Sequence, residues 1–272
     1  MLWGNKPTDG GKLLLTAEEK SDLERSAPMS SKFIRRIIGS QEMLQGDIRY
    51  CIWIEDDDRE EAEAIPQILS RTKAVAEFRA SSKAAQTRPA AAYPHRFRQI
   101  QDNATRHSFI IPSISSESRE GFPIGFGSER DILSNRAFGI YDASFFNFSI
   151  LSSRLHLVWL DTVCGKLETR YSYSNTLGWH SFPVPKLTES DKANLTRCAE
   201  DILLAREAHF PATIAELYDP EKMPDDLRAA HDRNDETLER IYIGRRFRND
   251  TERLEKLFDM YTKMTAKKEK AS

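Results

Sequence analysis

GKLETRYSYSNTLGWHSFPVP, residues 165 to 185, is the stretch around which the chain is organised, because it joins charged, aromatic and proline-rich sequence in one short segment. Its first ten residues alternate, which predicts a β-strand. Side chains in a strand alternate with a period of two, so Lys166, Glu168 and Arg170 should share one face. Paired polar groups beside aromatic side chains suit a planar polar ligand, such as the edge of a nucleic-acid base.

The spacing Glu-x-Arg at Glu168 and Arg170 has two interpretations. Arginine presents two parallel donors that match O6 and N7 of guanine, and glutamate can accept from N4 of cytosine, so the pair could read both partners of a G·C base pair. Alternatively, the two side chains form an ion pair that only stabilises a strand. Spacing alone does not separate these interpretations. Tyr171 and Tyr173 lie on the alternate face and are expected to pack.

The charge of the chain is balanced overall but segregated along the sequence. The 272 residues carry 40 Lys and Arg against 42 Asp and Glu, and this length suits one large domain or two ordinary ones. From Arg71 to His107, eight basic residues face two acidic ones, whereas Glu189 to Glu239 carries fourteen acidic and six basic residues. One part of the chain could therefore face a polyanion. A solvated basic helix and a solvated acidic helix would explain the charges equally well.

The three cysteines, Cys51, Cys164 and Cys198, are widely spaced and do not form a Cys-x-x-Cys motif. This argues against a disulfide framework and a structural zinc site, and fits a reducing cytoplasm. No apolar run approaches the length of a membrane span, and the N-terminus lacks a signal-peptide core. We therefore expect a cytoplasmic protein with no membrane partner.

Before residue 165 the sequence predicts a mixture of helices and strands. Thr16 followed by Glu19 is typical of a capping box that opens a helix. The acidic run 55–63 should begin a long helix with Ile68 on its apolar stripe and Arg79 among the cations on its other faces. Strands are expected over 49–54, 108–116, 122–126 and 137–141. One helix is expected over 145–163, in which His156 is a core or interface residue and not a ligand.

The stretch Arg88 to Arg98 interleaves aromatic and cationic side chains. Tyr93, Arg96 and Arg98 are the members that suit stacked bases and backbone phosphates, which makes them candidate DNA contacts. The same interleaving is common on ordinary protein surfaces.

After Pro185 the sequence pattern is helical only. At the other end, the turn-rich glycine segment at 4–11 suggests that this sequence begins within a longer protein. Helices are expected over 187–210, 213–218, 225–242 and 250–264, and the tail 267–272 is expected to be disordered. The predicted fold class is α+β: a mixed-sheet domain with flanking helices at 1–185, followed by an all-α domain at 186–272.

The groups that an enzyme needs are missing from this sequence. It has no Gly-x-Gly-x-x-Gly, no Asp/Asn-Pro-Pro-aromatic motif of amino-methyltransferases and no cluster of metal ligands. We therefore predict no catalytic residue, metal site or cofactor in this chain. Recognition of a ligand remains as its function.

Several segments resemble, in sequence and in order, the target-recognition region of the MmeI-like family of single-chain type II restriction-modification enzymes. Residues 214–242 resemble the helical segment at the C-terminus of that family. The matching target-recognition segments are GNKPTDGG at 4–11, IGSQE with RYCIWI within 38–54, IPSISSESREGFPIGF at 111–126, FNFSILSSRLHLVW at 146–159, CGKLETRYSYS at 164–174 and SFPVP at 181–185.

The resemblance implies a fragment of a longer enzyme that recognises double-stranded DNA. In the family, a nuclease and an adenine methyltransferase precede this region, so S-adenosylmethionine and Mg are expected in those other domains, in the same or a partner chain. Family members carry Glu-x-Arg or Lys-x-Asp at the place of Glu168 and Arg170, which implies that Arg170 reads guanine and Glu168 supports the opposite cytosine. Further candidate DNA contacts are Lys166, Arg119, Ser116, Arg96, Arg98 and Tyr93. The alternative is a separate specificity or protein-interaction subunit that docks to a methyltransferase or nuclease chain.

Overall fold

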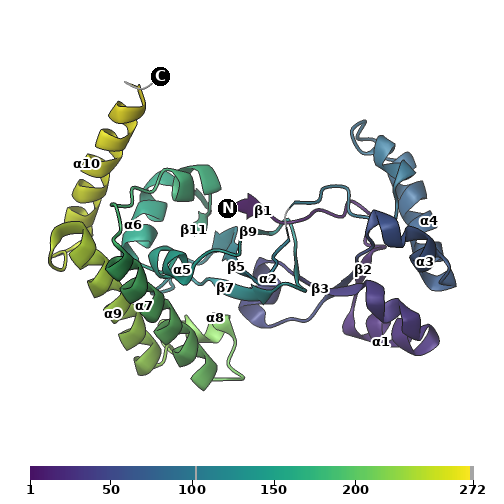
Figure 1. Ribbon diagram of the computed structural model, residues 1–272, viewed down its shortest axis with the longest axis horizontal. Coiled ribbons are helices and arrows are strands. Elements are labelled where there is room, and N and C mark those ends of the chain that lie inside the picture. Colours follow the sequence, from purple (N-terminus) through teal and green to yellow (C-terminus); the bar gives the residue numbers. More distant parts are fainter. Residues whose placement is uncertain (102, 270–272) are drawn as a thin grey trace. The chain divides into compact units, whose positions relative to one another are not determined.

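The computed structural model describes residues 1–101 and 103–269. The chain divides into two compact units, and each is described by itself. The first unit combines Leu2–Ser108 with Gly127–Tyr141, and the second combines Met1, Phe109–Phe126 and the chain from Asp142 onward. Figure 1 colours the chain by its order, so the helices from α7 to the C-terminus appear in green to yellow.

The first unit is built around a small mixed sheet with β3 (Ile34–Ile38) inside it. β3 pairs antiparallel with β4 (Tyr50–Ile52) and parallel with β8 (Ile132–Leu133), and β4 also pairs with β2 (Leu14–Leu15). Buried isoleucines on β3 fit the preference of β-branched residues for a pleated surface. In a second sheet, β1 (Leu2–Trp3) is the edge strand and pairs antiparallel with β9 (Ala137–Tyr141). The strands predicted within 49–54 and at 137–141 are confirmed.

The helices of the first unit follow local signals in the sequence. α1 (Ala17–Ser26) begins with the predicted capping box, in which the Glu19 amide donates to the Thr16 hydroxyl at 3.1 Å. The long helix predicted after the acidic run is wrong, because Ile65 precedes a proline and is extended, and α4 (Pro66–Ala80) starts only there. The remaining helices and 3-10 turns are α2 (Ser40–Gln45), α3 (Arg59–Glu63), Pro28–Phe33, Asp56–Asp58 and Arg88–Ala92.

Arg79 is the largest departure from the pattern expected for α4. The prediction that it lies on a solvent face is wrong, since its exposed fraction is 0%. All of its N–H groups bind backbone carbonyls: Nε donates to Thr8, Nη1 to Ala90 and Tyr93, and Nη2 to Pro7 and Arg96, at 2.8 to 3.1 Å. Five N–H groups are the full donor capacity of a guanidinium. Arg79 therefore orders both the glycine-rich start of the chain and the irregular stretch before residue 98.

In the second unit, α5 (Phe145–Leu151) and α6 (Arg154–Val163) replace the single helix predicted over 145–163. The break occurs because the Ser153 hydroxyl accepts from the His156 amide at 3.2 Å and caps α6. His156 is fully buried, as predicted. The strands of this unit are β6 (Ile114–Ser115), β10 (Gly165–Leu167) and β11 (Arg170–Ser172), and a π-helical turn follows at Asn175–His180. The chain passes from one unit to the other within two further strands, β5 (His107–Pro112) and β7 (Gly125–Ser128).

The segment after Pro185 is helical, as predicted. It comprises α7 (Glu189–Ala208), α8 (Ile214–Leu217), α9 (Asp225–Ile243) and α10 (Asp250–Glu269). Capping boxes at Thr188 and Thr213 open α7 and α8. α7 packs against both α5 and α9 (Figure 1). α10 continues to Glu269 although the sequence predicts disorder from residue 267, and residues 270–272 lie outside the described residues.

The core of the second unit draws on both sides of Pro185. This explains why the helices that follow residue 185 share a compact unit with part of the mixed α/β sequence. The fold class is α+β, with mixed sheets and a helical C-terminal segment. Among the described helices, none has both the length and the apolar character that a membrane span requires. The buried core residues are Ile150, Leu155, Trp159, Phe182, Leu195, Leu238, Tyr242, Phe247 and Leu257.

We predict that Arg79→Met lowers the free energy of unfolding by about 5 kcal/mol or more, because five carbonyls lose their donor and each buried carbonyl left without one costs about 1–3 kcal/mol. Urea unfolding followed by circular dichroism measures the change. Lys73→Met is the matched control, because Lys73 is exposed on the same helix. It should change stability by no more than about 0.5 kcal/mol. Equal effects of the two substitutions would contradict the role of Arg79.

Candidate nucleic-acid interface

The segment around Glu168 is a β-hairpin, so the prediction of one continuous strand is wrong. β10 pairs antiparallel with β11, and Leu167 lies opposite Arg170. Glu168 and Thr169 form the two-residue turn between them. Glu168 has a backbone φ of 59°, a value that residues other than glycine rarely adopt. Two-residue hairpin turns that need a positive φ at the first position usually have glycine or asparagine there. The sequence has no glycine or asparagine at the turn, which is why alternation suggested a strand.

The register of the hairpin also changes which side chains share a face. Residues directly opposite each other in an antiparallel pair lie on the same face. Lys166 pairs with Tyr171, and Leu167 pairs with Arg170, so Lys166 and Arg170 lie on opposite faces, and the predicted shared face is wrong. The Lys166 ammonium lies 5.7 Å from the centre of the Tyr171 ring and binds the Asp161 carboxylate at 2.8 Å, which raises the pKa of Lys166.

Glu168 and Arg170 do form an ion pair, with Nη2 of Arg170 2.7 Å from Oε2 of Glu168. The side chains are 74% and 45% exposed, respectively. Exposed pairs of this kind contribute at most about 1 kcal/mol to stability. The pair therefore contributes little to the stability of the hairpin. Breaking it costs little free energy, so each side chain can bind a group on another molecule instead.

The tip of the hairpin projects into solvent. Every residue of β10 is exposed, and the apolar side chain of Leu167 is 49% exposed. β11 pairs with β6 on its other edge, through Tyr171 opposite Ser115. A two-stranded ribbon is one of the two shapes that enter the major groove of B-form DNA. The exposed ribbon therefore has the shape needed to bring Glu168 and Arg170 to base edges.

The base of the hairpin, in contrast, is fixed to the core. Tyr173 is buried, its amide donates to the Ser113 carbonyl at 2.9 Å, and its ring centre lies 5.5 Å from that of Phe122. Its hydroxyl lies 3.1 Å from Nε2 of His156, whose pKa burial lowers to about 3. The packing role expected for Tyr173 is confirmed. A rigid base thus carries an exposed tip.

Loop 116–121 lies next to the tip and contributes a residue that the sequence did not single out. The Thr169 side chain lies beside Glu117 and is the main reason why the pKa of that carboxyl is lowered, with smaller contributions from Lys166 and Arg170. Only folding brings Glu117 to the turn, because the two segments are joined through β6 and β11. A serine-rich turn after a predicted strand was the only available signal.

Two predicted contacts in loop 116–121 are already engaged. The Ser116 hydroxyl lies 2.8 Å from the Ser118 hydroxyl. Nη1 of Arg119 donates to the Ala215 carbonyl at 3.2 Å, so this half-buried side chain points to α8. Arg119 therefore anchors the loop from behind, whereas Ser116 precedes Glu117 on the side of the hairpin.

The remaining candidate contacts belong to the first compact unit, not to the unit of the hairpin. Arg96 binds Asp56 at 2.7 Å and lies 4.9 Å from the centre of the Tyr93 ring. Arg98 donates to the Gln86 carbonyl at 3.1 Å. With Arg79 buried, the basic stretch predicted from residue 71 is not a continuous free patch. Arg96 and Tyr93 still form a partly exposed aromatic and cationic pair.

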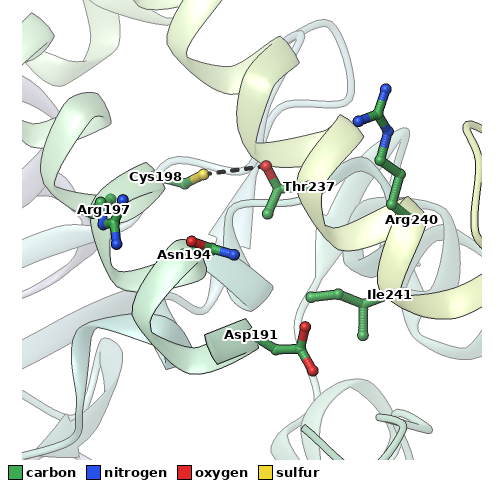
Figure 2. A pocket seen from close by; sticks show the side chains of 7 residues that line it. All are labelled: Asp191, Asn194, Arg197, Cys198, Thr237, Arg240 and Ile241. Carbon is green, nitrogen blue, oxygen red and sulfur yellow. Dashed lines mark hydrogen bonds between the residues drawn. The ribbon is translucent and has the colours of Figure 1, made fainter. Parts of the chain in front are cut away.

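A cleft of about 440 Å³ lies between α7 and α9 (Figure 2). Cys198 is the nucleophilic group in its wall, but its thiol donates to Oγ1 of Thr237 at 3.5 Å, and burial raises its pKa. A raised pKa leaves the thiol protonated and unreactive. The cleft therefore holds no activated nucleophile. Its lining residues are Asp191, Asn194, Arg197, Cys198, Thr237, Arg240 and Ile241.

Comparisons with known proteins cover nearly the whole chain. Residues 1–186 match the family described as MmeI, target recognition domain, and residues 187–268 match MmeI, C-terminal domain. DNA methyltransferase A of Bacillus subtilis (strain 168) is 37% identical over 263 residues, which are 97% of this chain and 30% of that protein. A solved structure of the type IIL restriction-modification enzyme MmeI in complex with DNA aligns with a TM-score of 0.92 and 37% identity, over 97% of this chain and 35% of that one.

The chain thus spans about a third of the length of each of these two relatives. The matches agree with the fold and with the order of the segments. Two family domains cover residues 1–268 without overlap. The chain belongs to the MmeI family and comprises its target recognition and C-terminal domains.

Proposed function

We propose that this chain recognises a short base sequence in double-stranded DNA and thereby directs a DNA methyltransferase to its site. Two relatives support the proposal, since one is a DNA methyltransferase and the other is a restriction-modification enzyme bound to DNA. The family description of residues 1–186 as a target recognition domain supports it as well. The single observation that carries it is the exposed hairpin with Glu168 and Arg170 at its tip.

The hairpin enters the major groove, where the donor and acceptor pattern of each base pair is unique. Arg170 donates to O6 and N7 of guanine, and Glu168 accepts from N4 of the opposite cytosine. In the free chain these side chains bind each other. Binding to DNA therefore replaces this charge-assisted hydrogen bond with hydrogen bonds to the bases. Glu117 adds a second carboxylate beside the same turn.

Other side chains supply affinity without reading sequence. Phosphate contacts position a protein on the duplex, whereas base contacts specify the site. Lys166 lies on the opposite face of the hairpin from Arg170 and binds a phosphate, and Ser116 is a further contact to the backbone. In the first compact unit, Arg96, Arg98 and Tyr93 form a second surface for the backbone. Arg119 remains bound to Ala215 and holds its loop.

The chemistry on DNA belongs to other domains. We assign adenine-N6 methylation, with S-adenosylmethionine, and cleavage, with Mg, to methyltransferase and nuclease domains in the same or a partner chain. Within residues 1–101 and 103–269 no group of three or more His, Cys, Asp or Glu is arranged to hold a metal ion. This chain contributes the choice of site and no catalytic group.

We predict that the full 272-residue chain binds duplex DNA with marked salt dependence, with a slope of log K against log [salt] of about −3 or steeper. Fluorescence anisotropy of a labelled duplex between low and physiological salt measures it. Lys166→Gln should reduce the slope by about 1, and Lys192→Gln, on the exposed face of α7, should not change it. No binding at low salt would rule out the proposed function.

We predict that exchanging Glu168→Lys together with Arg170→Asp changes the preferred base at one position of the site and leaves the other positions unchanged. Selection of bound duplexes from a randomised pool, followed by sequencing, reads the preference. Each bidentate contact is worth about 1–3 kcal/mol of discrimination. The control is Asp22→Lys with Arg25→Asp, an exposed ion pair on α1. An unchanged preference would remove the hairpin tip from the readout.

We predict opposite effects of Glu168→Gly on stability and on recognition. Glycine adopts the positive φ of this turn without strain, so the free energy of unfolding should rise by about 1 kcal/mol. Discrimination at the contacted base pair should fall by about tenfold, because the carboxylate is lost. Thr8→Gly, at a φ of 48°, relieves comparable strain away from the hairpin and should leave discrimination intact. Full discrimination in Glu168→Gly would show that the strained glutamate reads nothing.

A further inference from the structure

The back of loop 116–121 is held by helices of the C-terminal segment. The Arg119 guanidinium donates to the Ala215 carbonyl of α8, and the Glu120 carboxylate forms an ion pair with Arg228 of α9. Both contacts reach the loop from residues more than 90 positions further along the chain. Two successive loop residues are therefore tied to two different helices.

The next residue, Gly121, packs directly on the same helices. A Cβ atom at this position would lie 3.2 Å from Cε1 of Tyr218 and 3.7 Å from Cε1 of His231. The first distance is shorter than ordinary van der Waals contact, so the backbone of the loop lies against the Tyr218 ring with no space between them. Any movement of the loop toward the helices is blocked at this point.

A buried arginine completes the attachment where the loop becomes strand. Nη1 of Arg206 donates to the Ile124 carbonyl at 2.6 Å, and its Nε donates to the Tyr218 hydroxyl at 2.9 Å. The guanidinium carbon lies 4.8 Å and 5.2 Å from the ring centres of Tyr218 and Phe148. The Tyr218 hydroxyl lies 2.7 Å from Nε2 of His231. Polar groups and aromatic faces thus replace the water that Arg206 loses.

The front of the same loop is continuous with β6, and Ser115 at its start pairs with Tyr171 of the hairpin. The Thr169 side chain at the tip of the hairpin also lies beside Glu117. We propose that Arg206, Tyr218 and Arg228 are positioning residues for the reading of DNA sequence. They hold loop 116–121 from behind, and the loop in turn holds the hairpin that carries Glu168 through the pairing of β6 with β11. This inference rests on the proposed function and extends it, because it makes the C-terminal helices a part of the recognition site.

Arg228 offers the sharpest test, because its ion pair with Glu120 is partly exposed, with 37% and 38% of the side chains accessible. Pairs at such positions contribute little to global stability, so breaking one should leave the protein folded. Arg228→Glu should speed hydrogen exchange of the amides of residues 117–121. It should also lower discrimination in the randomised-duplex selection by about fivefold or more. Binding to nonspecific duplex at low salt and the Tm should stay unchanged.

The charge-reversed double variant, Glu120→Arg with Arg228→Glu, restores the ion pair and should recover slow exchange and discrimination. The matched control is Arg233→Glu on the same helix, whose ion pair with Asp201 at 3.6 Å does not touch the loop. It should change neither readout.

Three outcomes would overturn the inference. These are unchanged exchange at 117–121 in Arg228→Glu, no recovery in the double variant, or an equal loss of specific and nonspecific binding with a lower Tm. The last result would indicate a purely structural role. Absence of DNA binding by the unchanged chain would overturn the proposed function instead, while exchange at 117–121 would still decide whether Arg228 positions the loop.

Discussion

The buried guanidinium of Arg206 is the interaction on which the second compact unit depends. It bonds to the Ile124 carbonyl and the Tyr218 hydroxyl and lies between two aromatic rings, so its charge is balanced by dipoles instead of a carboxylate. A buried charge costs much free energy unless such partners replace water. The contact joins α7 to the end of the loop that touches the hairpin. The hydrophobic core across Pro185, with Trp159 and Leu238 among its members, depends on the same arrangement of helices.

In the first compact unit, another buried arginine, Arg79, binds backbone carbonyls. The sequence from residue 81 to 98 has little regular structure, so its carbonyls lack partners in a helix or sheet. Buried backbone groups need such partners, and three of the five N–H groups of Arg79 provide them to Ala90, Tyr93 and Arg96. An arginine that is buried in this way cannot contact DNA. Counting charges along the sequence therefore overstates the basic patch, because the buried Arg79 contributes to the fold and not to the surface.

The candidate interface separates anchoring from reading. Tyr173 and His156 fix the base of the hairpin in the core, while the ion pair at its tip is exposed and weak. The strained backbone of Glu168 fits this division, since strain persists where the surrounding structure holds it and often marks functional positions. Glu117 and the helices behind its loop then restrict the tip. Such preorganisation lowers the entropic cost of binding.

The sequence by itself determined the features that depend on near neighbours. These include the capping box at Thr16, the strand at 137–141, the burial of His156, the α+β class and the family. Tertiary structure alone decided that residues 165–172 turn back as a hairpin, that Arg79 is buried and that Glu117 meets Thr169. The physical reason is distance along the chain: Arg206 binds a carbonyl 82 residues away, and Arg79 binds carbonyls up to 72 residues away. No local pattern encodes partners that only folding brings together.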